Sequence, residues 1–234
     1  MTVAAVILFG SADEALADSA ERVAARRIVE AAWAGGATPI VVVAPDPDGR
    51  VAQALAGSPA VLAEPAPSPV GDAGQLARGA RLALDQVSET DAALAWPGRM
   101  AWVDAETVTS LIERHGIERS RVLRPTYESQ VGWPALLPLV ALPDLVALPP
   151  ALGLDELVAR LAGTHGSGLF DTGDPGTVHD VSVELAQMPA YAGPPEPARP
   201  APEWGAAAAD EGDDVPLEGP ALAPYGQAAD PESD

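Results

Sequence analysis

The sequence predicts an α/β fold of three layers, in which helices cover both faces of a mainly parallel sheet. Two continuous apolar runs, residues 3–9 and 39–43, are typical of strands that are buried on both faces. Between them, residues 19–35 have helical spacing, with Ala24 and Ile28 on one face. Strands that alternate with helices in this way indicate parallel strands joined by crossover helices.

Short apolar segments along the first 140 residues are predicted as strands. In chain order, the expected strands are residues 3–9, 39–43, 60–63, 92–96, 121–124 and 135–140. In sheets of this kind, ligands bind beyond the carboxyl ends of the strands. We therefore expect the binding residues in the loops 10–18, 64–71 and 97–104.

Segments with helical periodicity lie between and after these strands. The expected helices are residues 19–35, 48–56, 71–87, 104–115 and 155–162. The first of them ends at Gly35 and Gly36, and glycine commonly ends helices. Asp104 is the expected N-cap of the helix that it opens. The glycine-rich segment 163–168 is expected to be a flexible connector.

The composition changes near Tyr191, which divides the chain into a domain of residues 1–191 and a tail of residues 192–234. Proline, alanine and acidic residues dominate the tail, so it cannot bury enough apolar surface to fold by itself. Two interpretations remain open: a disordered tail, or an extended arm that docks on its own domain or on a partner. We favour docking, because large apolar residues are spaced along the tail. These expected docking residues are Trp204, Leu217, Leu222 and Tyr225.

The charge and the residue content exclude several classes of function. The chain has 13 basic residues, all of them arginine, against 34 acidic residues, and its net charge is −21. Such a chain repels nucleic acid and anionic membranes, so we expect neither as a partner. The absence of cysteine excludes disulfides and thiolate metal sites and suits the reducing cytoplasm, where we expect the protein.

The apolar segments do not predict membrane insertion. The N-terminal apolar run lacks the basic flank and the long apolar region of a signal peptide. The most apolar region, residues 133–148, is interrupted by three prolines and by Asp144, so we do not expect it to span a membrane.

Several short motifs follow one another in a characteristic order, each at the end of a predicted strand or at the start of a helix. They are Gly10-Ser11 after the first strand, the Gly-Gly end of the first helix, Gly71-Asp-Ala-Gly-Gln75-Leu-Ala-Arg-Gly79, Gly98-Arg99, Gly132-Trp133-Pro134 and Asp180-Val-Ser182. This order resembles the MobA-like nucleotidyltransferase family, especially its molybdenum cofactor cytidylyltransferase branch. The resemblance covers about residues 1–191.

The resemblance implies a nucleotide-diphospho-sugar transferase-like fold and a nucleotide site. In that family, a glycine-rich loop with Arg and Lys wraps a nucleoside triphosphate, and an Asp after the fourth strand holds Mg²⁺. A further acidic group near the end of the domain completes the metal site, and Asp180 is expected in this role. The residues expected at the nucleotide are Gly10, Ser11, Gly71, Gln75, Gly79, Gly98 and Arg99.

This chain departs from the family pattern at the positions that carry charge. The loop after the first strand has Asp13, Glu14 and Asp18 and lacks both cations. Arg99 falls on the position of the metal-binding Asp, and an arginine cannot bind Mg²⁺ as a ligand. Trp133 stands in place of the family's His.

Two interpretations of function follow from these departures. In the first, the protein has lost catalysis and acts as a binding or assembly protein in molybdenum cofactor handling or molybdoenzyme maturation. In the second, it is an active Mg²⁺-dependent enzyme that transfers nucleotide from CTP or GTP to molybdopterin or a sugar phosphate. We favour the first, because losing a single charge-stabilising donor typically lowers a rate by about 10²–10³.

The expected ligands and partners differ between these two interpretations. Mg²⁺ and a nucleoside triphosphate are expected only if the protein is active, and no residue is named as catalytic. A nucleotide or a molybdopterin ligand, and a protein partner that binds the tail, fit the first interpretation.

Trp96, Trp102 and Trp133 have two possible roles. Core packing is the default for each of them. If they instead converged at the mouth of a cleft, their indole rings would offer a stacking surface for a base or a pterin.

The docking hypothesis makes a prediction about the tail. Burying one large apolar side chain contributes about 1.5–3 kcal/mol, so several anchors together offset the ordering of a short segment. Deleting residues 193–234 should therefore lower the melting temperature or the solubility of the protein, or abolish a partner contact in a pull-down. If the truncated protein keeps all three properties unchanged, the tail is a plain disordered extension.

Overall fold

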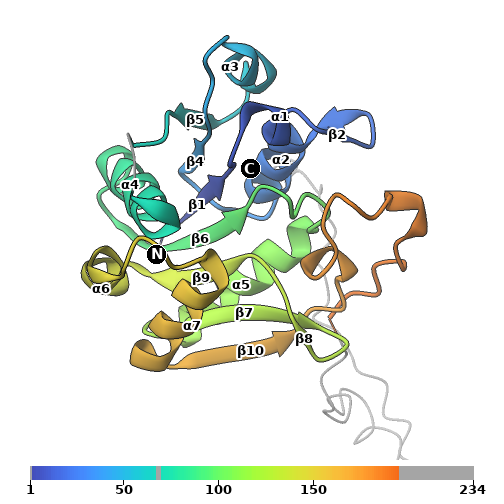
Figure 1. Ribbon diagram of the computed structural model, residues 1–234. Helices are drawn as coiled ribbons and strands as arrows, with labels where there is room; N and C mark the ends of the chain where they lie inside the picture. Colours follow the sequence, from blue (N-terminus) through green and yellow to red (C-terminus); the bar gives the residue numbers. More distant parts are fainter. Residues whose placement is uncertain (1, 67–69, 195–234) are drawn as a thin grey trace, which may run out of the picture. The chain divides into compact units, whose positions relative to one another are not determined.

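The computed structural model describes residues 2–66 and 70–194, and it confirms the predicted three-layer α/β fold (Figure 1). One mixed sheet has the strand order β10-β7-β9-β6-β1-β4-β5, and β8 pairs with β7. Its strands are β1 (Thr2–Leu8), β4 (Ile40–Val43), β5 (Ala60–Ala63), β6 (Thr90–Pro97), β7 (Val122–Tyr127), β8 (Gln130–Val131), β9 (Ala135–Pro138) and β10 (Ser167–Asp171).

Strand β1 lies inside the sheet and is parallel to both of its neighbours. Its last residue, Leu8, is paired with Val43 of β4 and with Pro97 of β6. Strand β5 is also parallel to β4, whereas β9 is antiparallel to β6 and β7. The carboxyl ends of β1, β4, β5 and β6 therefore meet at one edge of the sheet.

Helices cover both faces of the sheet, because the longer helices have an apolar side that packs on the strands. Helix α4 packs on β1 and β4 and contacts α6 and α7, while α2 packs against α5 (Figure 1). The helices are α1 (Ala12–Ala15), α2 (Ala24–Ala34), α3 (Arg50–Leu55), α4 (Gly71–Gln86), α5 (Ala105–Ile117), α6 (Leu142–Ala147) and α7 (Leu154–His165). In the described part of the chain, 3₁₀ turns lie at Leu139–Ala141, Pro175–Thr177 and Leu185–Gln187.

The prediction of one helix over residues 19–35 was wrong at its start. Strands β2 (Asp18–Ser19) and β3 (Arg22–Val23) form a small antiparallel hairpin, and helix α2 begins only at Ala24. The two turn residues, Ala20 and Glu21, have φ angles of 50° and 69°. Left-handed backbone at two successive residues fits a two-residue hairpin turn and excludes a right-handed helix.

The prediction that residues 163–168 are a flexible connector was also wrong. Helix α7 continues to His165, Gly166 turns the chain with a φ of 85°, and β10 follows at once. Strand β10 is parallel to β7 at the edge of the sheet.

Helix α6 goes beyond the predicted elements. Its proline lies in the first turn, where the backbone N–H would have no partner within the helix, so proline is tolerated there.

The closing strand that the resemblance implies at residues 180–182 is absent, because these residues form a turn. The backbone N–H and the hydroxyl of Ser182 both donate to Asp180 Oδ1, at 2.9 and 2.5 Å. A side chain that binds the backbone two residues further on favours a turn over a strand.

Two further findings concern the tail and the membrane. The expected docking residues Trp204, Leu217, Leu222 and Tyr225 lie outside the described residues.

Within residues 2–66 and 70–194, no helix is both long enough and apolar enough to cross a membrane.

The contact between α4 and the sheet predicts a large effect of one added methyl group. A Cβ atom at Gly79 would lie 2.3 Å from Val6 Cγ1, so Gly79→Ala should overpack the core and lower the free energy of unfolding by about 1–3 kcal/mol. Gly163→Ala is the matched control: it also lies in a helix, but its Cβ would have no neighbour within 4 Å. It should raise stability by about 0.5–1 kcal/mol. Equal effects of the two variants in urea unfolding would contradict this packing.

Candidate functional site

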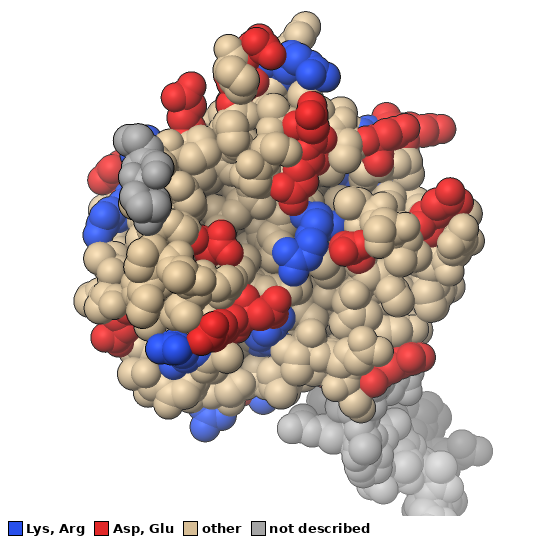
Figure 2. All heavy atoms as spheres, in the orientation of Figure 1, with Lys and Arg blue, Asp and Glu red and all other residues tan. Residues whose placement is uncertain are grey.

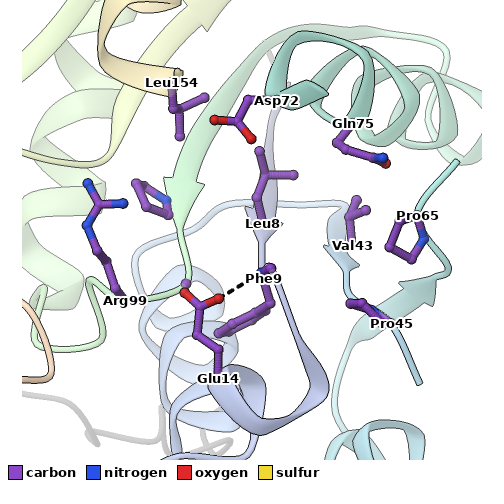
Figure 3. A pocket seen from close by; sticks show the side chains of 13 residues that line it. Leu8, Phe9, Glu14, Val43, Pro45, Pro65, Asp72, Gln75, Arg99 and Leu154 are labelled. Carbon is purple, nitrogen blue, oxygen red and sulfur yellow. Dashed lines mark hydrogen bonds between the residues drawn. The ribbon is translucent and has the colours of Figure 1, made fainter. Parts of the chain in front are cut away.

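A cleft of about 370 Å³ opens at the edge where the carboxyl ends of β1, β4, β5 and β6 meet (Figure 3). Four loops border it, one after each of these strands. Leu8, Phe9 and Val43 form its apolar floor, while Arg99 and Leu154 lie across from Pro65 and Gln75. The remaining lining residues are Gly10, Glu14, Pro45, Asp72, Pro97 and Gly98.

The carboxylate of Glu14 binds the loop that follows β1. The backbone N–H of Gly10 donates to Glu14 Oε2 at 2.7 Å (Figure 3). The N–H of Glu14 donates to Ser11 Oγ at 3.1 Å. Ser11 is thus the N-cap of α1, and Glu14 reaches back over it. An internal anion therefore occupies the backbone donor of Gly10, which the family resemblance assigns to a phosphate.

The charges that face the cleft do not favour a polyphosphate. Glu14 and Asp72 bring two carboxylates to the lining, and Arg99 is its one cation among the described residues. Figure 2 shows acidic and basic side chains around a hollow in the middle of this face. Because binding a triphosphate requires an excess of positive charge or of free N–H donors, this lining opposes it.

Gln75 of α4 fixes one wall of the cleft. Its amide oxygen accepts from the N–H of Ala66 at 3.0 Å, and its amide nitrogen donates to the carbonyl of Ala66 at 3.3 Å. Both ends of the amide are therefore engaged with the segment that follows β5. Gln75 therefore holds the segment with Pro65 beside the cleft, and its amide groups are already used in this contact.

Gly98 is required at the opposite wall by close packing. A Cβ atom there would lie 2.1 Å from the ring of Phe9. The N–H of Gly98 donates to the carbonyl of Leu8 at 2.7 Å, which holds the loop after β6 against the end of β1.

Arg99 lies beside two carboxylates. Its Nη2 is 3.9 Å from Asp155 Oδ2, and its carbonyl accepts from the N–H of Val181 at 2.9 Å. The pKa of Asp180 lies below its usual value, because the Ser182 hydroxyl and N–H donate to it and Arg99 is close, although partial burial opposes the shift. Asp180 therefore stays ionised and contributes to the field around Arg99.

The described residues do not form a metal centre. Within residues 2–66 and 70–194, no group of three His, Cys, Asp or Glu side chains is placed to hold a metal ion. Asp180 lies outside the cleft lining, and both of its nearest donors come from Ser182. The role of Asp180 as a metal ligand stays a prediction, and the residues around it do not fit Mg²⁺.

The cleft brings together only some of the predicted nucleotide-binding residues. Gly10, Gln75, Gly98 and Arg99 line it. Ser11, Gly71 and Gly79 have other surroundings. Ser11 caps α1, Gly71 has a φ of 58° and packs against the carbonyl of Pro150, and Gly79 packs on Val6.

Two lining carboxylates are additional to the predicted site residues. Glu14 is marked in the sequence by the pattern Ser11-x-x-Glu14, a capping box that indicates a helix start in a segment expected to be a loop. Asp72 is in the first turn of α4, where acidic residues commonly stabilise a helix. Nothing in the sequence around it therefore indicates that it lines a cleft.

The hypothesis that three indole rings converge at the cleft is wrong. Trp96, Trp102 and Trp133 are all buried, and none of them lines the cleft. The indole N–H of Trp96 donates to the carbonyl of Met100 at 2.9 Å, and that of Trp102 is 3.0 Å from the carbonyls of Asp180 and Val183. Trp133 stacks against Arg124. All three serve the core and its loops.

Comparison with known proteins identifies the family. The model of the MobA-like NTP transferase domain matches residues 9–165, and the chain therefore belongs to this family. No curated protein sequence matches the chain.

Solved structures of nucleotidyltransferases share the fold. A nucleotidyl transferase from Methanothermobacter thermautotroptrophicus has a TM-score of 0.63 and 18% identity, over 77% of this chain and 91% of that one. Rv0371c from Mycobacterium tuberculosis, in complex with manganese, has a TM-score of 0.57 and 18% identity, over 73% and 88% of the two chains. A CMP:2-keto-3-deoxy-manno-octonic acid synthetase in complex with CTP has a TM-score of 0.56 and 15% identity, over 73% and 90%. At these identities the likeness shows the fold alone.

The contact between Glu14 and Gly10 predicts that one substitution improves anion binding. Glu14→Ala removes a negative charge and frees the Gly10 N–H, so the affinity for pyrophosphate should rise about tenfold, as expected for one charge-assisted hydrogen bond. Asp13→Ala removes the same charge from a side chain that points into solvent next to Arg50, and it is the matched control. Calorimetric titration measures both. A rise that is equal in the two variants would show a general charge effect and contradict the specific role of Glu14.

Proposed function

We propose that this protein is a nucleotidyltransferase-fold binding protein that has lost nucleotide transfer and serves in molybdenum cofactor handling or molybdoenzyme maturation. Its cleft is the expected binding site, for a nucleotide or a molybdopterin ligand. A protein partner that contacts the tail completes the proposed assembly role. The absence of cysteine agrees with a cytoplasmic location.

One observation carries the loss of transfer: the Glu14 carboxylate accepts a 2.7 Å hydrogen bond from the Gly10 N–H. Nucleotidyl transfer depends on donors and cations that are already oriented towards the developing charge of the transition state. Here the loop donor is engaged by a carboxylate of the same loop, and the charge it would stabilise meets repulsion from Glu14 and Asp72.

The second support is the cation at the expected metal position. Among the fold neighbours, one structure contains manganese and another contains CTP. In this chain Arg99 follows Gly98 at the cleft, and the positive charge of its guanidinium repels a divalent cation. Any phosphate bound here would therefore be held by Arg99 directly rather than through Mg²⁺.

The molybdenum-related role is supported by the family resemblance and by the apolar floor of the cleft. Leu8, Phe9 and Val43 offer apolar surface next to a wall that carries Pro45 and Pro65. Apolar surface with a few polar groups at its rim is typical of sites for planar organic ligands. A pterin has such a planar ring and carries far less charge than a nucleoside triphosphate.

Calorimetric titration with CTP and GTP, each with and without Mg²⁺, tests the proposal. We expect millimolar or undetectable binding and no effect of Mg²⁺, because the described lining of the cleft has one cation and two carboxylates. Pyrophosphate release in the presence of molybdopterin or a sugar phosphate should be absent. Micromolar, Mg²⁺-dependent binding together with pyrophosphate release that is lost in Asp180→Ala would instead establish an active transferase.

A further inference from the structure

We propose that Arg99 and Arg124 together form a subsite for the phosphate group of a small organic phosphate monoester, and that the carboxylate of Asp155 competes with this phosphate. The proposal rests on the binding function proposed above and specifies the ligand class. It adds two residues, Arg124 and Asp155, to those that the family resemblance points to.

Two guanidinium groups approach the same carboxylate, one from strand β7 and one from the loop that follows strand β6. Nη2 of Arg124, on β7, is 3.3 Å from Asp155 Oδ1, and Nη2 of Arg99, in the loop after β6, is 3.9 Å from Asp155 Oδ2. One carboxylate thus serves two cations, and each cation faces a different oxygen. Two arginines around one small oxyanion are typical of phosphate recognition.

Arg124 is held rigidly in place. Its Nε donates to the carbonyl of Gly132 at 2.9 Å, and its Cζ lies 4.3 Å from the ring centroid of Trp133. Only 13% of its side chain is exposed, and burial lowers its pKa from the ordinary arginine value. A buried guanidinium is poorly hydrated and already oriented, so it gains more from an anion than an exposed one does.

Arg99 connects this subsite to the cleft. It lines the cleft together with Leu154, which directly precedes Asp155 at the start of α7 (Figure 3). Within residues 2–66 and 70–194, the Arg99 guanidinium makes no hydrogen bond, and its distance of 3.9 Å to Asp155 is too long for one. Its donors can therefore turn towards a ligand whose organic part lies in the cleft.

Asp155 is a weakly held competitor. Its side chain is 65% exposed, and the 3.3 Å contact with Arg124 is its one hydrogen bond among the described residues. Because the Asp155 end of this pair is exposed, water and salt ions can screen its carboxylate, although Arg124 is buried. A phosphate monoester has three terminal oxygens, so it can accept hydrogen bonds from both arginines at once. Among the residues described, Asp155 accepts only from Arg124, at 3.3 Å, and lies 3.9 Å from Arg99.

The size and charge of the site select a monoester over a polyphosphate. The cleft of about 370 Å³ has room for a small organic group next to Arg99. Glu14 and Asp72 repel further phosphates along the cleft, whereas a single phosphate group has two arginines to offset its charge.

The test compares Asp155→Asn and Arg99→Gln with the wild-type protein. Inorganic phosphate and ribose 5-phosphate are titrated by calorimetry, and the indole ¹⁵N–¹H signal of Trp133 is followed by NMR. Asp155→Asn removes the competing charge with little change of shape, so phosphate should bind about fivefold tighter or more; Arg99→Gln should weaken it about tenfold, as for one charge-assisted hydrogen bond. The Trp133 signal should shift on binding, because Arg124 stacks on this ring.

Arg160→Gln is the matched control. Arg160 is a half-exposed arginine on α7, the helix that also carries Asp155, and it pairs with Glu156 at 2.9 Å. It should leave phosphate affinity unchanged, and acetate should bind more weakly than phosphate to every variant. The proposal is overturned if neither wild type nor Asp155→Asn binds phosphate, if Asp155→Asn binds it no more tightly, or if Arg99→Gln keeps wild-type affinity. It is also overturned if the Trp133 signal does not move or if acetate binds as well as phosphate. None of these outcomes alters the expected lack of nucleotide turnover, which is measured separately with CTP and GTP.

Discussion

Strand β1 is hydrogen-bonded on both edges and buried on both faces, and the position of the cleft depends on this burial. Val3, Val6 and Ile7 are almost fully removed from water, and α4 approaches closely because Gly79 has no side chain. The strand therefore ends at a fixed place between β4 and β6. From that end, Gly10 and Glu14 follow within a few residues, so a short loop places a carboxylate at the base of the cleft.

Charge distinguishes this cleft from a site built for nucleoside triphosphates. The chain has no lysine, and its acidic loop after β1 carries Glu14 where its relatives are expected to carry cations. The arginines at this face are already engaged with carboxylates: Arg99 and Arg124 share Asp155, and Asp180 lies near Arg99. The chain has the fold of nucleotidyltransferases, and this charge pattern is the basis of our proposal that its ligand carries less charge than a nucleoside triphosphate.

The sequence predicts the long buried elements better than the short hairpin at residues 18–23 and the glycine-containing strand β10. Strands β1 and β4 and helix α4 have strong apolar patterns, because burial on a sheet restricts residue type at every second or third position. The hairpin at residues 18–23 lacks such a pattern, since its turn uses left-handed Ala20 and Glu21 where glycine or asparagine is usual. Strand β10 could not be predicted from the sequence, because Gly166 before it and Gly168 within it are typical of a linker.

The site residues differ in the same way. Gly98 and Arg99 could be predicted because they follow a strand that is recognisable from its apolar run. The pairing of Arg124 with Asp155 joins residues 31 positions apart and depends on how α7 packs beside β7. No local sequence pattern could therefore predict it. Glu14 carried a capping signal, but its contact with the Gly10 N–H depends on the conformation of the loop.

The amide ¹⁵N–¹H signal of Gly10, followed during titration with CTP and Mg²⁺, tests most directly whether Glu14 blocks this phosphate donor. Because Glu14 already accepts the hydrogen bond of this amide, we expect the signal not to move when the nucleotide is present at micromolar concentration. A saturable shift of the Gly10 signal at micromolar CTP, present only with Mg²⁺, would show instead that a phosphate displaces Glu14.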